Sequence, residues 1–94
     1  MVARTIERQY LPMIKDEFGK KIQTFRKTAA MTQEALADRA GLGNRFLQDI
    51  EAGNKQPTIT TVFRLAKALD LTPGELLDPI YYCWNDEVSS KAGE

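Results

Sequence analysis

Apolar residues recur at intervals of three and four along most of the chain, which is the spacing of one face of an α-helix. Ile14, Phe18, Ile22 and Phe25 form the first such stripe. Acidic residues lie early in this segment and basic residues lie late, as the dipole of a helix favours. The pattern therefore predicts a helix over about residues 13–28.

Two shorter helices follow, separated by only three residues. Thr32 is a good N-cap for a helix that ends at Gly41, because glycine readily takes the left-handed conformation that closes a helix. Another helical run covers residues 44–52, with Leu47 and Ile50 on one side. A connection this short fixes the two helices at a large angle to each other.

The second half of the chain predicts two more helices. Thr58 caps a helix over residues 59–70, whose apolar stripe is wide. The sequence Thr-Pro-Gly-Glu at residues 72–75 is a complete helix start, with a cap, a proline in the first turn and a glutamate that closes a capping box. We expect this last helix over about residues 73–78, ending before Pro79.

The predicted fold is all-α, a compact bundle of five helices, because no segment shows convincing strand alternation. We expect the bundle in residues 16–79, an N-terminal extension in residues 1–15 and a C-terminal tail in residues 80–94. The last ten residues, 85–94, are polar and are expected to fray.

The two flanking segments carry hydrophobic residues whose role stays open. The tail starts with Ile80-Tyr81-Tyr82-Cys83-Trp84, which either folds back over the core or builds a homodimer interface together with Leu76 and Leu77. The extension has Ile6, Tyr10 and Leu11 at helix-like spacing, with Arg4 and Arg8 beside them. We favour an extra helix that packs on the bundle or on a partner over a basic arm that lies on DNA.

Composition excludes several classes of function. The 94 residues include no histidine and one cysteine, Cys83, so zinc fingers, disulfide scaffolds and histidine-based catalysis are excluded. We find no catalytic constellation, metal site or phosphate-binding glycine loop, and we expect no enzyme activity and no cofactor. No apolar run approaches the length of a membrane span, and nothing at the N-terminus directs export. We expect a soluble cytoplasmic protein.

The net charge is zero, which is unusual for a protein that binds nucleic acid. The charges are unevenly distributed, however. Residues 1–55 carry ten basic and seven acidic residues, whereas residues 56–94 carry three basic and six acidic residues. This asymmetry permits a basic face on the first half of the chain.

The paired short helices meet a specific set of side-chain requirements. Ala37 is small enough for the next helix to cross over it, and Gly41 accepts a positive φ. With these residues in register, the chain resembles the Cro/C1-type helix-turn-helix family of phage and bacterial repressors, from about Phe18 to Leu77. The resemblance rests on Phe18-Gly19, Ile22, Phe25-Arg26, Thr32-Gln33-Glu34-Ala35-Leu36-Ala37, Gly41-Leu42, Leu47, Ile50-Glu51-Ala52-Gly53, Pro57 and Leu65-Ala66-Lys67-Ala68-Leu69.

The resemblance implies a lambda-repressor-like domain whose helix at residues 44–52 enters the major groove of DNA. The residues that it implies at the DNA are Gln33, Asn44, Arg45, Phe46, Gln48, Asp49, Asn54, Lys55 and Thr58. Gln33 would donate to a phosphate and brace the start of the reading helix. Arg45 would favour guanine, Asn44 would favour adenine or a phosphate, and Phe46 would touch a thymine methyl. The loop that contains Asn54, Lys55 and Thr58 would hold the DNA backbone.

Two departures from the family pattern affect the reading helix. Gly43 replaces the usual serine or threonine cap, and Asp49 stands where a neutral or basic residue is more usual. Asp49 would accept from cytosine or repel phosphate. For Asn44 and Gln48, an exposed position without DNA contact stays open, and for Phe46 and Asp49 that alternative is slightly favoured. The resemblance also implies an interior ion pair between Arg26 and Glu51.

We therefore expect a sequence-specific DNA-binding regulator, a repressor that binds a near-palindromic operator as a homodimer. One alternative is an antitoxin or restriction-modification controller protein of the same fold, and an antitoxin would also bind a toxin. The other alternative is a protein-interaction module that has lost DNA binding, which the neutral charge, Gly43 and Asp49 would favour.

Overall fold

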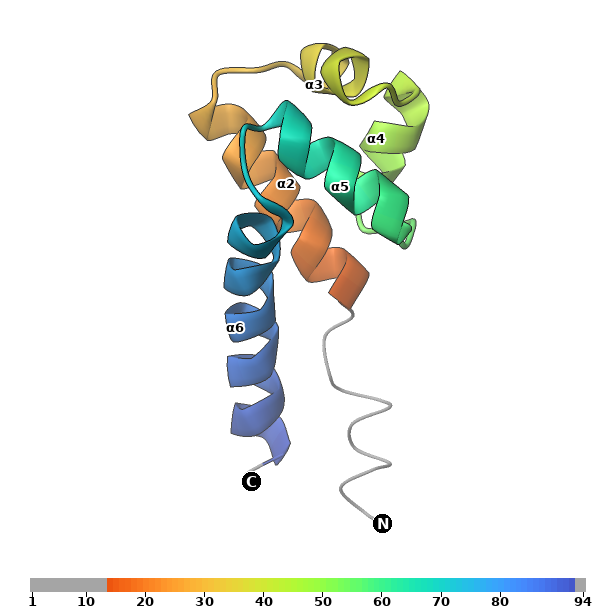
Figure 1. Cartoon of the computed structure of the whole chain (residues 1–94). Helices are drawn as coiled ribbons and strands as arrows, with labels where there is room; N and C mark the ends of the chain where they lie inside the picture. Colours follow the sequence, from red (N-terminus) through yellow and green to blue (C-terminus); the bar gives the residue numbers. More distant parts are fainter. Residues whose placement is uncertain (1–13, 93–94) are drawn as a thin grey trace.

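The computed structural model describes residues 14–92, with side chains described as far as residue 87, and this part of the chain forms five α-helices and no strand (Figure 1). The helices are α2 (Ile14–Thr28), α3 (Gln33–Ala40), α4 (Asn44–Glu51), α5 (Ile59–Ala68) and α6 (Pro73–Ala92). The predicted all-α class and the order of the five helices are confirmed. The Ile6, Tyr10 and Leu11 pattern lies outside the described residues.

Helix α2 is central to the arrangement, because it packs against both α4 and α6. Helix α3 packs on α4 and α5, and α5 in turn packs on α6. Figure 1 shows α3, α4 and α5 gathered at one end of the molecule around α2, while α6 continues away from them. The helix-turn-helix pair is therefore at one end of the molecule and the free part of α6 is at the other.

A single hydrophobic core joins all five helices. Its largest fully buried side chains come from every one of them: Ile22, Leu36, Leu47, Ile50, Leu65 and Leu76. Burial of a side chain of this size contributes about 1.5–3 kcal/mol relative to exposure. This core holds three helices of eight to ten residues, which are too short to be stable helices in isolation.

Three threonine caps fix the starts of α3, α5 and α6. The hydroxyl oxygen of Thr32 accepts from the backbone N–H of Ala35 at 3.0 Å, and that of Thr58 accepts from Thr61 at 3.2 Å. At α6, the N–H of Glu75 donates to the Thr72 hydroxyl at 3.0 Å, and the N–H of Thr72 donates to the Glu75 carboxylate at 2.8 Å. These bonds confirm the predicted caps and the capping box.

The expected end of α6 before Pro79 is wrong, because the helix continues through this proline to Ala92. Pro79 has no N–H to donate to the carbonyl of Glu75, so local chemistry disfavours the helix at this point. Ile80 lies buried in the core one residue later, and Cys83 and Trp84 are partly buried after it. Burial of the following turn outweighs the lost hydrogen bond. The expected fraying is likewise wrong for residues 85–92, which are helical.

The fourth predicted helix also ends earlier than expected. Helix α5 stops at Ala68, and Asp70 takes a left-handed conformation with φ of 59°. Asp and Asn are the non-glycine residues that most readily adopt this conformation.

Candidate nucleic-acid interface

The turn between α3 and α4 depends on one left-handed glycine. Gly41 has φ of 69° and ψ of 33°, and its N–H points back at the last carbonyls of α3. The N–H of Leu42 donates to the carbonyl of Ala37 at 2.8 Å, which closes the turn. Leu42 then packs on the core. These contacts fix the orientation of α4 relative to α3.

The C-terminal end of α4 is fixed by a buried ion pair. Arg26 Nε donates to Glu51 Oε2 at 2.7 Å, and Arg26 Nη2 donates to Glu51 Oε1 at 3.1 Å. The carboxylate side chain is 1% exposed and the guanidinium side chain is 11% exposed. Arg26 Nη1 also donates to the carbonyl of Met31 at 2.9 Å. The expected pair is therefore present, and it also ties the connector after α2 to α4.

Gln33 joins this network. Its amide Nε2 donates to Glu51 Oε1 at 2.8 Å and so braces the end of α4, while its side chain also lines a pocket with Asn44 at the start of that helix. The buried carboxylate accepts from Gln33 as well as from Arg26 and thereby satisfies its hydrogen-bonding capacity without water. A phosphate contact by the remaining N–H of this amide stays a prediction.

Gly19 permits α2 and α4 to approach closely. A Cβ at this position would lie 2.7 Å from the carbonyl oxygen of Glu51 and would also collide with that of Ile50. The amide of Gln23 donates to the same Glu51 carbonyl at 3.3 Å. In the sequence, Gly19 is part of the motif that carries the family resemblance. It is also a glycine inside an otherwise regular helical stripe, a signal that often marks close backbone contact.

The outward side of α4 presents three polar residues. Asn44, Arg45 and Gln48 are exposed, and the side chain of Arg45 is 86% exposed. Asp49 was expected at an equally exposed position, but its side chain is only 23% exposed. It lies one turn from Arg45, and the Arg45 Nε to Asp49 Oδ1 distance is 3.6 Å. This pairing gives Asp49 a local partner and lowers the net charge of the surface.

Phe46 is a candidate site residue whose ring is not freely exposed. It is partly buried and packs against the hydrophobic core. Burial of its aromatic ring stabilises the domain, and this accounts for a phenylalanine at the position without any base contact. A contact between Phe46 and a thymine methyl stays a prediction, and the partial burial favours the alternative without DNA contact.

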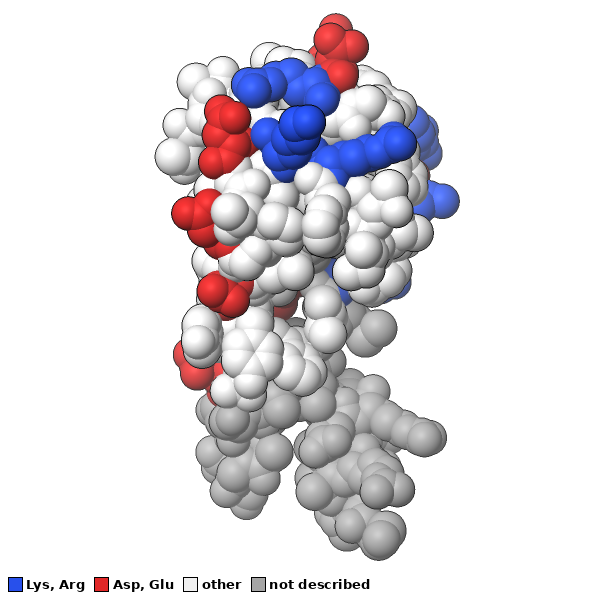
Figure 2. Space-filling model, viewed as in Figure 1, with Lys and Arg blue, Asp and Glu red and all other residues white. Residues whose placement is uncertain are grey.

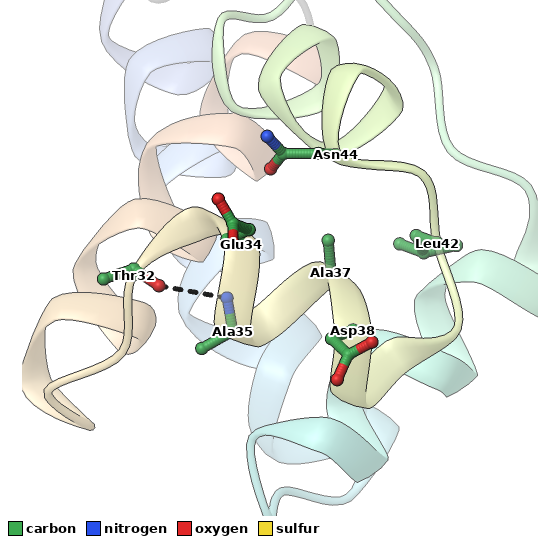
Figure 3. Close-up of a pocket in the computed structure, with 7 residues that line it drawn as sticks. All are labelled: Thr32, Glu34, Ala35, Ala37, Asp38, Leu42 and Asn44. Atoms are coloured by element: carbon green, nitrogen blue, oxygen red, sulfur yellow. Dashed lines mark hydrogen bonds between the residues drawn. The ribbon is translucent and has the colours of Figure 1, made fainter.

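A groove of about 550 Å³ separates the N-terminal parts of α3 and α4 (Figure 3). Its lining residues are Thr32, Glu34, Ala35, Ala37, Asp38, Leu42 and Asn44. Figure 3 shows Glu34 and Asn44, one from each helix, beside the same opening, with the small Ala37 between the two helices. The groove holds two carboxylates and no basic side chain among these residues, and Asn44 presents its amide at the opening.

The loop after α4 presents the remaining candidates. Asn54 and Lys55 are exposed, and Gly53 turns the chain with φ of 80°. The hydroxyl of Thr58 caps α5 and also donates to Thr61 Oγ1 at 3.2 Å. The Thr58 side chain is therefore engaged within the protein, whereas Lys55 extends into solvent.

The described residues contain no group of three or more Cys, Asp or Glu side chains that could hold a metal ion. None of the helices within residues 14–92 is long and apolar enough to cross a membrane.

The sequence and the structure match known proteins. The family model described as Helix-turn-helix (HTH_3) matches residues 22–76. The "Uncharacterized HTH-type transcriptional regulator y4dJ" of Sinorhizobium fredii is 33% identical over 61 residues, which cover 65% of this chain and 79% of the relative. The "Control protein C.BamHI" of Bacillus amyloliquefaciens is 34% identical over 62 residues, covering 65% of this chain and 76% of the relative.

Among solved structures, the restriction-modification controller protein C.AhdI from Aeromonas hydrophila superposes with a TM-score of 0.64. It is 31% identical and covers 66% of this chain and 94% of its own. The matched family is a class of DNA-binding regulators and not a class of enzyme. The family match covers more than half of the chain and spans α3, the turn and α4, so the chain belongs to the helix-turn-helix family of DNA-binding transcriptional regulators.

Proposed function

We propose that this protein is a repressor that binds a near-palindromic operator as a homodimer. The observation that carries the proposal is an exposed polar side of α4 whose position is fixed by the buried Arg26–Glu51 pair. One eight-residue helix reads few base pairs, so two symmetry-related copies, about 34 Å apart, give useful specificity. We also propose that the protein acts in the cytoplasm.

In this proposal, Arg45 and Gln48 read bases and Asn44 reads adenine or holds a phosphate. Arg45 suits guanine, because its guanidinium donates two parallel hydrogen bonds to the O6 and N7 acceptors. Its present pairing with Asp49 is exposed and weak, since such pairs contribute about 0.2–1 kcal/mol. DNA therefore displaces it at little cost, and Asp49 either accepts from cytosine or orients Arg45.

The DNA backbone contacts come from the start of α3 and from the segment that follows α4. Gln33 at the start of α3 donates to one phosphate, and Asn54 and Lys55 contact another. Thr58 contacts the DNA backbone through its own main chain at the start of α5, because its hydroxyl already serves as a cap. Phe46 supports α4 from the inside and makes no DNA contact in this proposal.

The homodimer forms through one side of α6. Ile14, Leu77, Ile80, Tyr81 and Trp84 line an apolar groove of about 170 Å³. Tyr81 is exposed and lies near Trp84, with ring centroids 6.4 Å apart. Exposed aromatic rings beside an apolar groove are typical anchors of protein interfaces. Leu76, also expected at this interface, is fully buried in the core and therefore does not contribute.

A second candidate is the control of a restriction-modification system. It is favoured by the relatives named control protein C.BamHI and controller protein C.AhdI. The physical mechanism on DNA is the same in both cases, and only the regulated genes differ. Transcription of a reporter from the selected operator, with and without the protein, separates repression from activation.

Selection of DNA from a random pool, followed by binding measurements at several salt concentrations, tests the proposal. We expect one enriched near-palindrome and an affinity that falls steeply with salt, because bound lysine and arginine side chains release counterions. Arg45→Ala should weaken binding by about 5- to 150-fold, the effect of losing one bidentate base contact. Failure to enrich any sequence, or a salt-independent affinity, would contradict the proposal.

Arg39→Ala is the matched control for that experiment. Arg39 is also exposed and also faces a carboxylate, with 3.9 Å between its Nη2 and Asp70 Oδ2, but it lies on α3 near α5 rather than on α4. The control removes the same charge and should leave specificity unchanged.

A further inference from the structure

Helix α5 presents an exposed stripe that mixes apolar and basic residues. Ile59, Phe63 and Lys67 are four residues apart and therefore lie on one side of the helix. Ile59 is 70% exposed and Phe63 is 56% exposed. Arg64 lies beside them on α5 and Arg39 lies on the adjoining α3. We call these five residues the α5 face.

The α5 face is electropositive at one end. Arg39, Arg64 and Lys67 line one groove of about 360 Å³, together with Asp70. Figure 2 shows Lys and Arg side chains gathered at the end of the molecule where α3 and α5 lie. Asp70 approaches Arg39 at 3.9 Å and its side chain is 85% exposed, so this single contact leaves most of the positive charge uncompensated.

Helix α6 presents a complementary stripe on its outer side. Glu75, Asp78, Tyr82 and Asp86 follow one another at intervals of three, four and four, and all four are exposed. No basic residue lies in α6 between residues 73 and 87, and Figure 2 shows acidic side chains along this side of the molecule. We call these four residues the α6 face. Its helical positions differ from those of Leu77 and Trp84, which line the apolar groove.

We propose that the α5 face of one molecule binds the α6 face of a second copy. The two faces match in charge, since three basic residues meet three acidic residues. They also match in apolar content, since Ile59 and Phe63 on one face meet the ring of Tyr82 on the other. The contact is heterologous, because it joins two different surfaces.

This association is separate from DNA reading and from the apolar groove. A homodimer built through the groove still presents an α5 face and an α6 face on each copy, so the new contact joins dimers to one another. A heterologous contact repeats along a row of molecules unless its geometry closes a ring. The contact therefore joins dimers into larger species.

Salt separates the two kinds of contact. Attraction between exposed charges is screened beyond about 10 Å at 0.1 M salt and beyond about 3 Å at 1 M. The contact between the two faces should therefore weaken as salt increases, whereas the apolar groove should remain occupied because burial of apolar surface does not depend on charge.

Sedimentation velocity of the full chain without DNA, at about 0.05 M and about 1 M salt, tests the proposal. We expect species larger than a dimer at low salt and their loss at high salt. Arg64→Glu/Lys67→Glu makes the α5 face acidic, and Asp78→Lys/Asp86→Lys makes the α6 face basic. Each double variant alone should associate at least about tenfold more weakly, because several exposed charge pairs become repulsive.

Sedimentation of a mixture of the two double variants is the decisive measurement. The acidic α5 face of the first then meets the basic α6 face of the second, so large species should return. Lys20→Glu/Lys21→Glu is the matched control, because it makes the same change of charge on α2, outside both faces, and should associate like the wild type. Arg64→Gln/Lys67→Gln removes the charges without reversing them and should weaken association by a smaller factor.

Circular dichroism and operator binding verify that each variant is folded. The proposal is overturned if the wild type forms no species larger than a dimer at low salt, if the charge reversals leave those species unchanged, or if the mixture fails to restore them. Loss of operator binding in the wild type would contradict the proposed function instead, and it would leave the sedimentation result intact.

Discussion

Helices α4 and α6 both pack on α2 through buried apolar side chains, and α4 is also tied to α2 by a buried ion pair. The end of α4 is fixed by the buried carboxylate of Glu51, which accepts from Arg26 and Gln33. Helix α6 is anchored by the buried side chains of Leu76 and Ile80. Hydrogen bonds and ion pairs are directional, whereas apolar burial is not. The helix that we propose to present side chains to DNA is therefore the one whose orientation is also fixed by directional bonds.

The difference also appears in what the two helices leave exposed. Helix α4 exposes polar side chains that suit base edges, whereas α6 exposes aromatic and acidic side chains. We interpret α4 as the specific reader and α6 as the association element.

Arg26→Ala should have the largest effect. It leaves the Glu51 carboxylate buried without its charged partner, which typically costs about 3–5 kcal/mol of unfolding free energy. A domain of this size has only about 5–15 kcal/mol in total. Chemical denaturation measures the loss. Arg45→Ala, in the exposed pair with Asp49, is the control and should lose less than about 1 kcal/mol. Equal losses would contradict a directional anchor at α4.

Gly19→Ala should have the next largest effect. The added Cβ would collide with backbone carbonyls at the end of α4, which cannot move without displacing that helix. Overpacking of this kind costs about 1–3 kcal/mol, and operator affinity should fall with it. Gly74→Ala in α6 is the matched control, because its nearest neighbour to a Cβ is Thr72 Oγ1 at 3.8 Å. A stable Gly19→Ala variant with normal operator binding would show that the α2–α4 spacing is not critical.

Pro79→Ala should stabilise α6. The substitution restores an N–H that donates to the carbonyl of Glu75, and alanine is favoured over proline inside a helix by about 3 kcal/mol. Release of the proline's constraint on the unfolded chain offsets about 0.4–1 kcal/mol of this gain. Hydrogen exchange of the amides after residue 79 should slow. Faster exchange there would mean that the proline is required for the packing of Ile80.

Gly43→Ser should have the smallest effect. Gly43 caps α4 without a side-chain hydrogen bond, and a Cβ at this position has no neighbour within 4 Å. A serine hydroxyl would accept from an N–H in the first turn, which raises helix stability by a few tenths of a kcal/mol relative to glycine. Thermal denaturation should show a small increase in Tm. A decrease would mean that the added side chain disturbs the turn.

Local signals predicted the α3–turn–α4 unit well, because its determinants are close in sequence. The Thr32 cap, the left-handed Gly41 and the start of α4 after Gly43 are all found where the pattern placed them. The ion pair of Arg26 and Glu51 joins residues far apart in sequence. It was expected from the family resemblance, since no local pattern encodes it.

The errors have a common physical cause, which is contact between distant segments. The local sequence alone predicts that Pro79 ends a helix. Burial of Ile80 in the core stabilises the next turn, so α6 continues through the proline. The hydrogen bond from Gln33 to the buried carboxylate of Glu51, at the far end of α4, was likewise not expected. In each case the structure is determined by a contact with residues that are distant in the sequence.

The central claim is that α4 reads bases while the loop after it holds only the backbone. The most direct test measures the affinity of the wild type, Arg45→Ala and Lys55→Ala for the selected operator and for versions with one base pair changed in each half-site. The account predicts that Arg45→Ala loses discrimination at one base pair, and that Lys55→Ala weakens binding to all versions equally with a smaller salt dependence. If Arg45→Ala keeps full discrimination at every base pair, the assignment of α4 as the reading helix is contradicted.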